Sequence, residues 1–231
     1  MYLSRLILNP RSRQARNELA DPYEMHRTVC NAFPDGIFKA ERNEENVRPI
    51  LFRVDLHPRT RIPTLLVQSR QKPDWSFLQI HKDYLLGENE LPLDVENPAI
   101  KEMNLRLSEG HVLVFRLRAN PTFKKTEVKE NGEKHKSRLG ILKEENQRKW
   151  LEDKLKSAGA ALVSVNIVNE QFTHGKLFIE KEKKKRLNFL SVQFDGVLQV
   201  KDSNNLVNTI FTGFGSAKGL GFGLLSLARA P

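Results

Sequence analysis

Hydrophobic and polar positions follow two different periods along the chain. In "HVLVFRLRAN" (residues 111–120), apolar Leu113, Phe115 and Leu117 alternate with the other positions, which predicts a half-buried strand. In "DPYEMHRTVCNAF" (residues 21–33) the apolar residues instead recur at helical spacing. Asp21 there is a good N-cap, Pro22 suits the first helical position, and Glu24 completes a pattern like a capping box. The two stretches therefore predict one strand and one capped helix.

A second amphipathic helix is predicted over residues 143–159. Its apolar stripe consists of Trp150, Leu151, Leu155 and Ala158. Further strands are expected at residues 2–9, 50–57, 64–69, 101–107, 161–169, 176–182, 187–201 and 224–230, with a short helix at 203–213. Residues 10–20 and 124–138 are polar and are expected to form solvated loops, and residues 73–87 predict no definite element.

The order of these elements indicates an α+β protein. Strand, helix, strand pair, an uncertain element and a strand occur once, and approximately the same order follows again. Two tandem ferredoxin-like (RRM-like) domains, each β-α-β-β-α-β, fit this order. We expect an N-terminal domain at residues 1–109, which carries the capped helix. A C-terminal domain at residues 110–231 would carry a basic hairpin and a glycine-rich loop.

The charge of the chain narrows the choice of partners. Lysine and arginine outnumber aspartate and glutamate by 38 to 28, a formal net charge of +10. A surface this basic favours a polyanion, either a nucleic acid or an anionic membrane. We find no run of about 18 apolar residues and no signal-peptide pattern, so we expect a cytoplasmic protein. The single cysteine, Cys30, excludes an internal disulfide and any multi-cysteine zinc site.

A glycine-rich stretch, "GFGSAKGLGFG", runs from Gly213 to Gly223. It matches neither a dinucleotide fingerprint nor a Walker loop, because Lys218 stands where the first needs glycine and Ala217 stands where the second needs it. Two interpretations remain. The stretch either joins a helix to the last strand, or its backbone amides near Gly219 and Gly221 bind an RNA phosphate together with Lys218.

Three stretches together resemble one family. "YEMHRTVCNAFPDG" near the start, "FRLRANPT" at residues 115–122 and "GFGSAKGLGFGLLSLARA" at the end are similar to the CasE endoribonucleases, which process CRISPR precursor RNA in the Cascade effector. The resemblance spans the whole chain and is weaker over residues 39–107. It implies a tandem ferredoxin-like protein that cuts the repeat RNA beside its stem-loop. The protein would then stay bound to the hairpin beside other Cascade subunits. We expect a monomer when the protein is free.

RNA cleavage of this kind needs few protein groups, because the 2′-hydroxyl is the nucleophile. The reaction needs a base for that hydroxyl, an acid for the 5′-oxygen, and positive charge near the phosphate. No metal or other cofactor is required, and the products are a 2′,3′-cyclic phosphate and a 5′-hydroxyl. Histidine suits the proton transfer because its ordinary pKa is about 6.5.

His26 has the best context of the six histidines. It lies in the first turns of the capped helix, and Tyr23 precedes it by three residues, so both can lie on one face. The residues alone favour a surface histidine on an ordinary helix at position 26, whereas the resemblance implies that His26 and Tyr23 are catalytic. Arg27 either contacts phosphate or is a solvated charge. Position 31 is Asn31 rather than lysine, so charge would come from Arg27 or from Lys218, and we expect Cys30 to be a packing residue.

Basic stretches supply the other candidates for RNA binding. Five cations are predicted at a hairpin tip, which could enter the groove of an A-form stem or be a solubilising turn: Lys181, Lys183, Lys184, Lys185 and Arg186. Arg116 and Arg118 could present a basic sheet face, and residues 124–138 could wrap RNA or be merely solvated.

Two rival functions remain at this point. A tandem ferredoxin-like protein can bind RNA without cutting it, and the Tyr23–His26 pair is the feature that a pure binder does not need. A metal-dependent nuclease would need clustered carboxylates, and the sequence has no D-x-D or H-E-x-x-H pattern.

Overall fold

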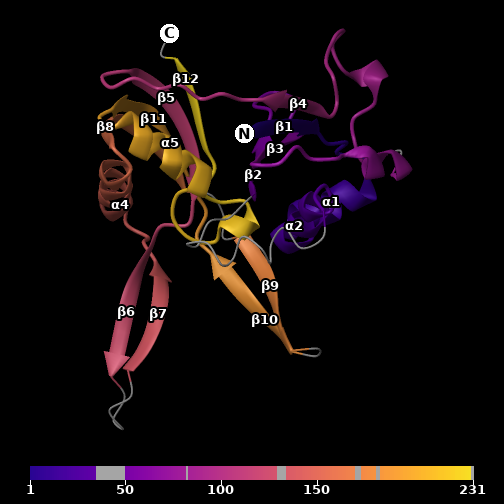
Figure 1. Cartoon of the computed structure of the whole chain (residues 1–231). Helices are drawn as coiled ribbons and strands as arrows, with labels where there is room; N and C mark the ends of the chain where they lie inside the picture. The colour runs from indigo at the N-terminus through magenta and orange to yellow at the C-terminus, as the bar shows by residue number, and fades with distance from the viewer. Residues whose placement is uncertain (35–49, 82, 129–133, 170–172, 181–182, 230–231) are drawn as a thin grey trace.

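The chain folds into a mixed α and β structure with antiparallel sheets, which confirms the predicted class (Figure 1). The computed structural model describes residues 1–34, 50–81, 83–128, 134–169, 173–180 and 183–229. The first four-stranded sheet has the order β2-β3-β1-β4. Its strands are β1 (Tyr2–Ile7), β2 (Ile50–Leu56), β3 (Pro63–Ser69) and β4 (Ala99–Glu102).

Two helices, α1 (Arg13–Ala20) and α2 (Pro22–Cys30), cover one face of this sheet (Figure 1). Met25 and Val29 of α2 are buried in one core with Leu6, Phe52 and Leu65 of the strands. Between β3 and β4 the chain forms the short 3₁₀ helices η2 (Ser76–Ile80) and η3 (Glu88–Glu90). Among the described residues, no α-helix stands there. The first half therefore departs from the expected β-α-β-β-α-β order.

Helix α1 was not predicted, because residues 13–20 are mostly polar and were expected to form a loop. Ser12 caps the helix by accepting a hydrogen bond from the Ala15 N–H at 3.4 Å. Only Ala15 and Glu18 of this helix are buried. A helix that buries so few apolar side chains has no clear apolar stripe in its sequence.

The predicted cap of α2 is confirmed, but the predicted capping box is wrong. The Asp21 side chain accepts a hydrogen bond from the Tyr23 N–H at 3.1 Å. The Asp21 N–H already donates to the carbonyl of Asn17 at the end of α1, so it does not need Glu24. Glu24 instead pairs with Arg27, one turn later, at 3.0 Å.

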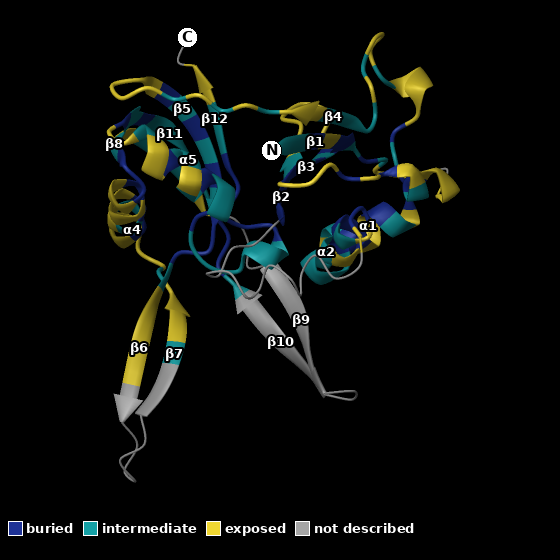
Figure 2. Cartoon of the chain, viewed as in Figure 1, coloured by how far each residue is buried: buried dark blue, intermediate teal, exposed yellow. Residues whose placement is uncertain are grey.

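The second four-stranded sheet has the order β12-β5-β11-β8. Its strands are β5 (Val112–Ala119), β8 (Ala160–Asn169), β11 (Val192–Val200) and β12 (Leu225–Arg229), with helices α4 (Glu144–Ser157) and α5 (Ser203–Thr212). The predicted alternation in β5 is confirmed, since Leu113, Phe115 and Leu117 are all in the core. In the predicted stripe of the second helix, Leu151 and Leu155 are fully buried. Figure 2 shows buried residues along both sheets and exposed residues on the outer side of α4.

Two long hairpins extend from the body, and both correct the sequence predictions (Figure 1). The expected loop at residues 124–138 is wrong, because β6 (Thr122–Val128) pairs with β7 (Lys134–Gly140). Residues 129–133 lie outside the described residues. The single strand expected at 187–201 is also wrong: β10 (Lys183–Phe189), paired with β9 (Thr173–Glu180), ends before β11 begins. The buried residues Leu190 and Ser191 separate the two strands.

The strand expected at residues 101–107 is misplaced. Strand β4 ends at Glu102, and Leu105 and Leu107 pack against the core of the second sheet instead. No helix among the described residues is long and apolar enough to cross a bilayer.

The two sheets are joined through a buried arginine. The Arg53 side chain on β2 is 2% exposed and forms a salt bridge with Asp55 at 2.8 Å. Its guanidinium also donates to the carbonyls of Arg116 and Leu224 at 3.2 and 3.1 Å, and to Ser226 Oγ at 3.0 Å. Gln68 on β3 adds a second link, since its Nε2 donates to the Ile210 carbonyl of α5 at 2.9 Å. The first sheet is thus hydrogen-bonded to three elements of the second half.

Arg53→Ala should lower the free energy of unfolding by about 3–5 kcal/mol, because it leaves Asp55 and the carbonyls of Arg116 and Leu224 without this donor. Urea unfolding of the purified variant measures this loss. Arg59→Ala is the matched control, since Arg59 is exposed in the turn after β2 and should change stability by no more than about 0.5 kcal/mol. Equal losses in the two variants would contradict the role given to Arg53.

Candidate functional site

Helix α2 presents Tyr23, His26 and Arg27 away from the core. Met25, Thr28 and Val29 are buried, whereas Tyr23 and His26 are half-buried and Arg27 is exposed. Tyr23 and His26 are three residues apart on this helix, which puts them on neighbouring positions of one face. The structure thus places both predicted catalytic residues at the surface of the same helix.

The His26 ring lies on an aromatic support. It stacks on Phe52 of β2, with ring centroids 6.2 Å apart and planes inclined by 18°. Phe52 itself is only 2% exposed, so its position is fixed by the core. The Cys30 sulfur lies 3.6 Å from Nε2 and 3.8 Å from Nδ1 of His26. A ring held by a buried neighbour keeps a defined orientation while part of its edge stays accessible.

The glycine-rich loop (Gly213–Gly223) reaches the same aromatic ring. Its 3₁₀ helix η4 (Lys218–Leu220) packs against α2 and β2. A Cβ added to Gly221 would lie 3.2 Å from Phe52 Cε2. His26 and the loop therefore meet at Phe52, although they are about two hundred residues apart in the sequence.

Glycine is required in this loop because the backbone turns sharply against itself. Gly223 has φ +88°, and a Cβ there would lie 2.6 Å from the Phe214 carbonyl oxygen. The Phe214 N–H in turn donates to the Gly223 carbonyl at 2.9 Å. The Gly223 N–H donates to the Arg118 carbonyl at 2.8 Å, which ties the loop to β5. The first interpretation of the loop, a connection from helix to strand, thus describes part of its structure.

Lys218 contributes to the shape of the loop as well as to its charge. Its Nζ donates to the Thr212 carbonyl at the C-terminus of α5, at 2.6 Å. Ammonium groups at this end of a helix are favourable because the last carbonyls are partly negative. Gly219 lies next to Lys218 within η4.

The predicted arginines of β5 are bonded to neighbouring residues of the second sheet and of the segment before β11. Arg116 pairs with Asp195 of β11, with Nε–Oδ1 2.7 Å, and Arg118 Nε donates to Ser191 Oγ at 2.9 Å. The Arg118 guanidinium also lies 5.7 Å from the Phe222 ring centroid, a cation–π geometry.

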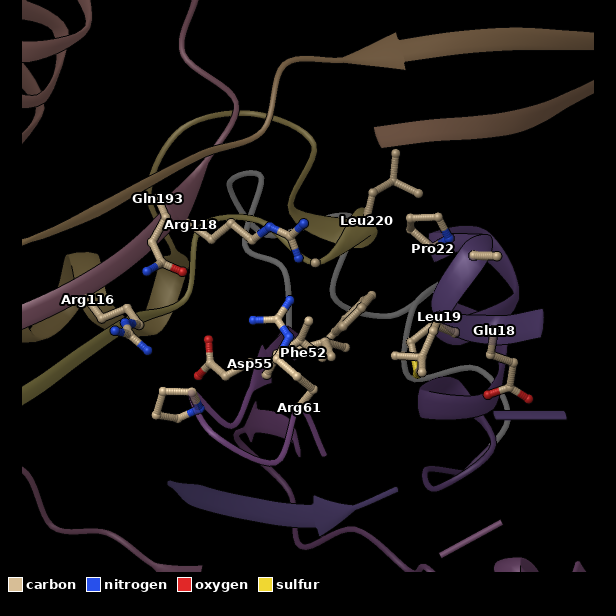
Figure 3. Close-up of a pocket in the computed structure, with 16 residues that line it drawn as sticks. Glu18, Leu19, Pro22, Phe52, Asp55, Arg61, Arg116, Arg118, Gln193 and Leu220 are labelled. Atoms are coloured by element: carbon tan, nitrogen blue, oxygen red, sulfur yellow. The ribbon is translucent and has the colours of Figure 1, made fainter. Parts of the chain in front are cut away.

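These two arginines line a cavity of about 800 Å³ between the two halves of the molecule (Figure 3). Pro22, Leu19 and Phe52 lie on the other side of it, and Arg61 also lines it. His26 and Tyr23 are not among its lining residues. The cavity therefore adjoins the candidate site but is not that site.

A second, smaller hollow of about 420 Å³ lies on the other side of the glycine-rich loop. Four cations from four elements line it: Lys124 of β6, Arg138 of β7, Lys154 of α4 and Lys218 of the loop. None of the described residues that line it is acidic. We call this the cationic hollow.

The predicted basic hairpin is confirmed, and its described cations lie at the start of the second strand. Lys183, Lys184, Lys185 and Arg186 are the first residues of β10, and Lys183 pairs with Glu180, the last residue of β9. Lys181 lies outside the described residues. Strand β9 contacts α2, so this hairpin starts beside the helix that carries His26.

Sequence reasoning missed Phe52 and Lys154. Phe52 looks like any core residue of an apolar strand, and only the fold brings it under His26. Lys154 is one of several lysines on an exposed helix face, and only its place beside Arg138 distinguishes it. Among the described residues, no group of three or more histidine, cysteine, aspartate or glutamate side chains could hold a metal ion.

The site therefore combines a supported histidine, a tight glycine-rich loop and a hollow lined by cations. This combination defines a basic α+β protein that is built to receive a polyanion at the junction of two sheets. The family described as "CRISPR associated protein" matches residues 1–229. The chain belongs to this family.

Individual relatives match over the whole length. CRISPR-associated endoribonuclease Cse3 of Thermus thermophilus is 33% identical over 235 aligned positions, which cover 99% of this chain and 100% of the relative. CRISPR system Cascade subunit CasE of Escherichia coli strain K12 is 28% identical over 99% of each chain. A solved structure of CRISPR endoribonuclease Cse3 bound to a 19-nucleotide RNA is similar with a TM-score of 0.76 at 32% identity. That match covers 99% of this chain and 100% of the other.

Proposed function

We propose that the protein is an endoribonuclease that cleaves CRISPR precursor RNA beside the repeat stem-loop. The observation that carries this proposal is the meeting of His26 with the glycine-rich loop at Phe52, in a chain 33% identical to a CRISPR-associated endoribonuclease. A histidine can exchange a proton near neutrality, and the loop lies where a phosphate would have to be held. The proposal therefore joins proton transfer and phosphate binding at one place.

The reaction is a transesterification within the RNA. The 2′-oxygen forms a bond to phosphorus as its proton passes to a base, and the bond from phosphorus to the 5′-oxygen breaks as that oxygen receives a proton. His26 exchanges one of these protons, and Tyr23 orients the 2′-hydroxyl or takes part in the transfer. The products are a 2′,3′-cyclic phosphate and a 5′-hydroxyl. No metal is needed, since positive charge from side chains stabilises the transition state.

The cationic hollow supports binding of the RNA stem. Its cations come from both strands of the β6–β7 hairpin, from α4 and from the loop, so their positions relative to one another are set by the fold. From Ser216 in the hollow to Gly221 at Phe52, five residues span at most about 18 Å. One bound RNA hairpin can therefore contact the hollow and His26 together. Arg27 is exposed beside His26 and is a further phosphate contact.

The two halves are best interpreted as tandem ferredoxin-like units. The strand orders β2-β3-β1-β4 and β12-β5-β11-β8 are equivalent when each sheet is numbered along its own half. Each sheet also has its own core. Both observations support a division close to residue 109, with Leu105 and Leu107 already packed on the second core.

The binding partners of this chain are predicted from the names of its relatives. CasE of Escherichia coli is a subunit of the Cascade system. We propose that this protein likewise keeps the cleaved hairpin and joins other Cascade subunits. A cytoplasmic location and a monomeric free protein are part of the same proposal.

His26→Ala should cut repeat RNA at least ~100-fold more slowly, because one general acid or base contributes about 10²–10⁴ to the rate. The affinity for the hairpin should be retained, because affinity depends mainly on dispersed phosphate contacts. Single-turnover cleavage and hairpin binding, measured on the same preparation, give both quantities.

His57→Ala is the matched control, since His57 is an exposed histidine in the turn between β2 and β3. It should cleave like the wild type. If His26→Ala also cleaved at the wild-type rate, His26 would have no part in the mechanism. A wild-type protein that bound the hairpin without cutting it would instead favour the RNA-binding module.

Lys154→Ala should weaken hairpin binding and reduce the slope of log affinity against log salt by about one unit, because one phosphate contact is lost. Lys156→Ala is the control: Lys156 is also exposed in the last turn of α4 but does not line the cationic hollow. Titration of a labelled hairpin at several salt concentrations measures both slopes. The same slope in the two variants would exclude the hollow from RNA binding.

A further inference from the structure

A buried carboxylate lies directly behind the candidate catalytic helix. Glu18 of α1 is 6% exposed and accepts three hydrogen bonds from side chains. Gln14 Nε2 donates to its Oε1 at 2.9 Å, Thr28 Oγ1 donates to the same oxygen at 2.8 Å, and the Tyr84 hydroxyl donates to Oε2 at 2.5 Å. We call these four residues the Glu18 cluster.

The Glu18 cluster ties three segments together. Gln14 and Glu18 belong to α1, Thr28 belongs to α2, and Tyr84 follows η2. Tyr84 is fully buried in the core of the first sheet and also lies 3.8 Å from the Met25 sulfur, as measured from its hydroxyl. Helix α2 is therefore bound to the same buried tyrosine at two positions, directly through Met25 and through Glu18 at Thr28.

These two anchoring positions flank His26 in the sequence and face the opposite way. Met25 and Thr28 point into the core, while His26 between them stacks on Phe52. A rotation of α2 about its axis would break the contacts of Thr28 and Met25 and would move the His26 ring off Phe52. The hydrogen bonds of Glu18 thus oppose the motion that would disturb the site.

The chemistry of the cluster suits a fixed clamp. All three partners donate to Glu18, which matches an ionised carboxylate that can only accept. Burial raises the pKa of the Tyr84 hydroxyl, and the neighbouring Glu18 charge raises it further. Tyr84 therefore stays protonated and keeps donating throughout the range in which the protein works. Hydrogen bonds to a charged acceptor are stronger than neutral ones, so the clamp is stiff.

We infer that Glu18 is a positioning residue for the reaction at His26, acting with Tyr84 and Thr28 to hold α2 in the orientation that stacks His26 on Phe52. The expected effect on the rate of RNA cleavage rests on the proposed function, whereas the orientation of His26 does not. A misplacement of about 1 Å in a reacting group can cost roughly a hundredfold in rate. Loss of a hydrogen bond to Glu18 should therefore slow RNA cleavage even in a variant that stays folded.

Tyr84→Phe and Thr28→Val test the inference, because each removes one hydroxyl and leaves the shape of the side chain nearly unchanged. Each should lower the single-turnover rate of hairpin cleavage by roughly ten- to a hundredfold, with unchanged hairpin affinity. The rate is measured well below the melting temperature of each variant. Tyr2→Phe is the matched control, since Tyr2 lies on β1 outside the Glu18 cluster, and it should cleave like the wild type.

The second readout does not depend on activity. Stacking on Phe52 shifts the ring-proton NMR signals of His26, which are assigned by their absence in His26→Ala. Both variants should move these signals toward the position of an unstacked histidine. The inference is overturned if rate and signals equal those of the wild type while only the melting temperature falls. It is also overturned if the loss of rate follows a loss of hairpin affinity.

Failure of the proposed function is distinguishable from failure of this inference. If the wild type does not cut RNA, the proposed activity is wrong, and the NMR signals alone decide whether the cluster orients His26. If the wild type cuts RNA and both variants cut it equally fast, the activity stands and the positioning role is wrong.

Discussion

The arrangement of the whole site depends on one buried charge, the guanidinium of Arg53. A charge that is 2% exposed must be paired and fully hydrogen-bonded, and Arg53 meets this demand through Asp55 and through acceptors on β5, on β12 and just before β12. No neutral residue could satisfy the same set of acceptors in the same geometry. The edge strand β2 is thereby held against the second half at one defined place. The position of the glycine-rich loop relative to Phe52 depends on this contact.

Phe52 directly precedes Arg53 on β2. Because side chains alternate along a strand, the Phe52 side chain lies on the face opposite to that of Arg53. One face of β2 therefore docks the second half, while the other supports α2 and the His26 ring. The glycine-rich loop comes from the second half and reaches the same Phe52 at Gly221. The residues proposed for proton transfer and for phosphate binding come from opposite ends of the chain, and the Arg53 junction brings these two ends together. Other residues of the same loop, Gly213–Ser216 and Lys218, line the cationic hollow.

The parts that the sequence predicted are those whose signal is local. The alternation in β5, the Asp21 cap and the apolar stripe of α4 all depend on neighbours within one or two turns, and each is confirmed. Helix α1 and the β6–β7 hairpin were missed because α1 buries few apolar side chains and the described side chains of the hairpin are mostly exposed, so no period marks either element. The interacting pairs of the site could not be predicted, because Arg53 meets partners up to 173 residues away and arginine is normally exposed. The contact of Phe52 with His26 could not be predicted either, because Phe52 looks like any core residue of an apolar strand.

In the proposed reaction, the RNA attacks its own phosphate beside His26 without a metal. The direct measurement incubates the protein with a repeat hairpin in excess EDTA, beside an identical hairpin that carries a 2′-deoxy nucleotide just upstream of the cut. We expect the first hairpin to be cut to a 2′,3′-cyclic phosphate and a 5′-hydroxyl, and the second to be bound equally well but to stay intact. Cleavage of the deoxy hairpin at the normal rate, or a product with a 5′-phosphate, would exclude this mechanism.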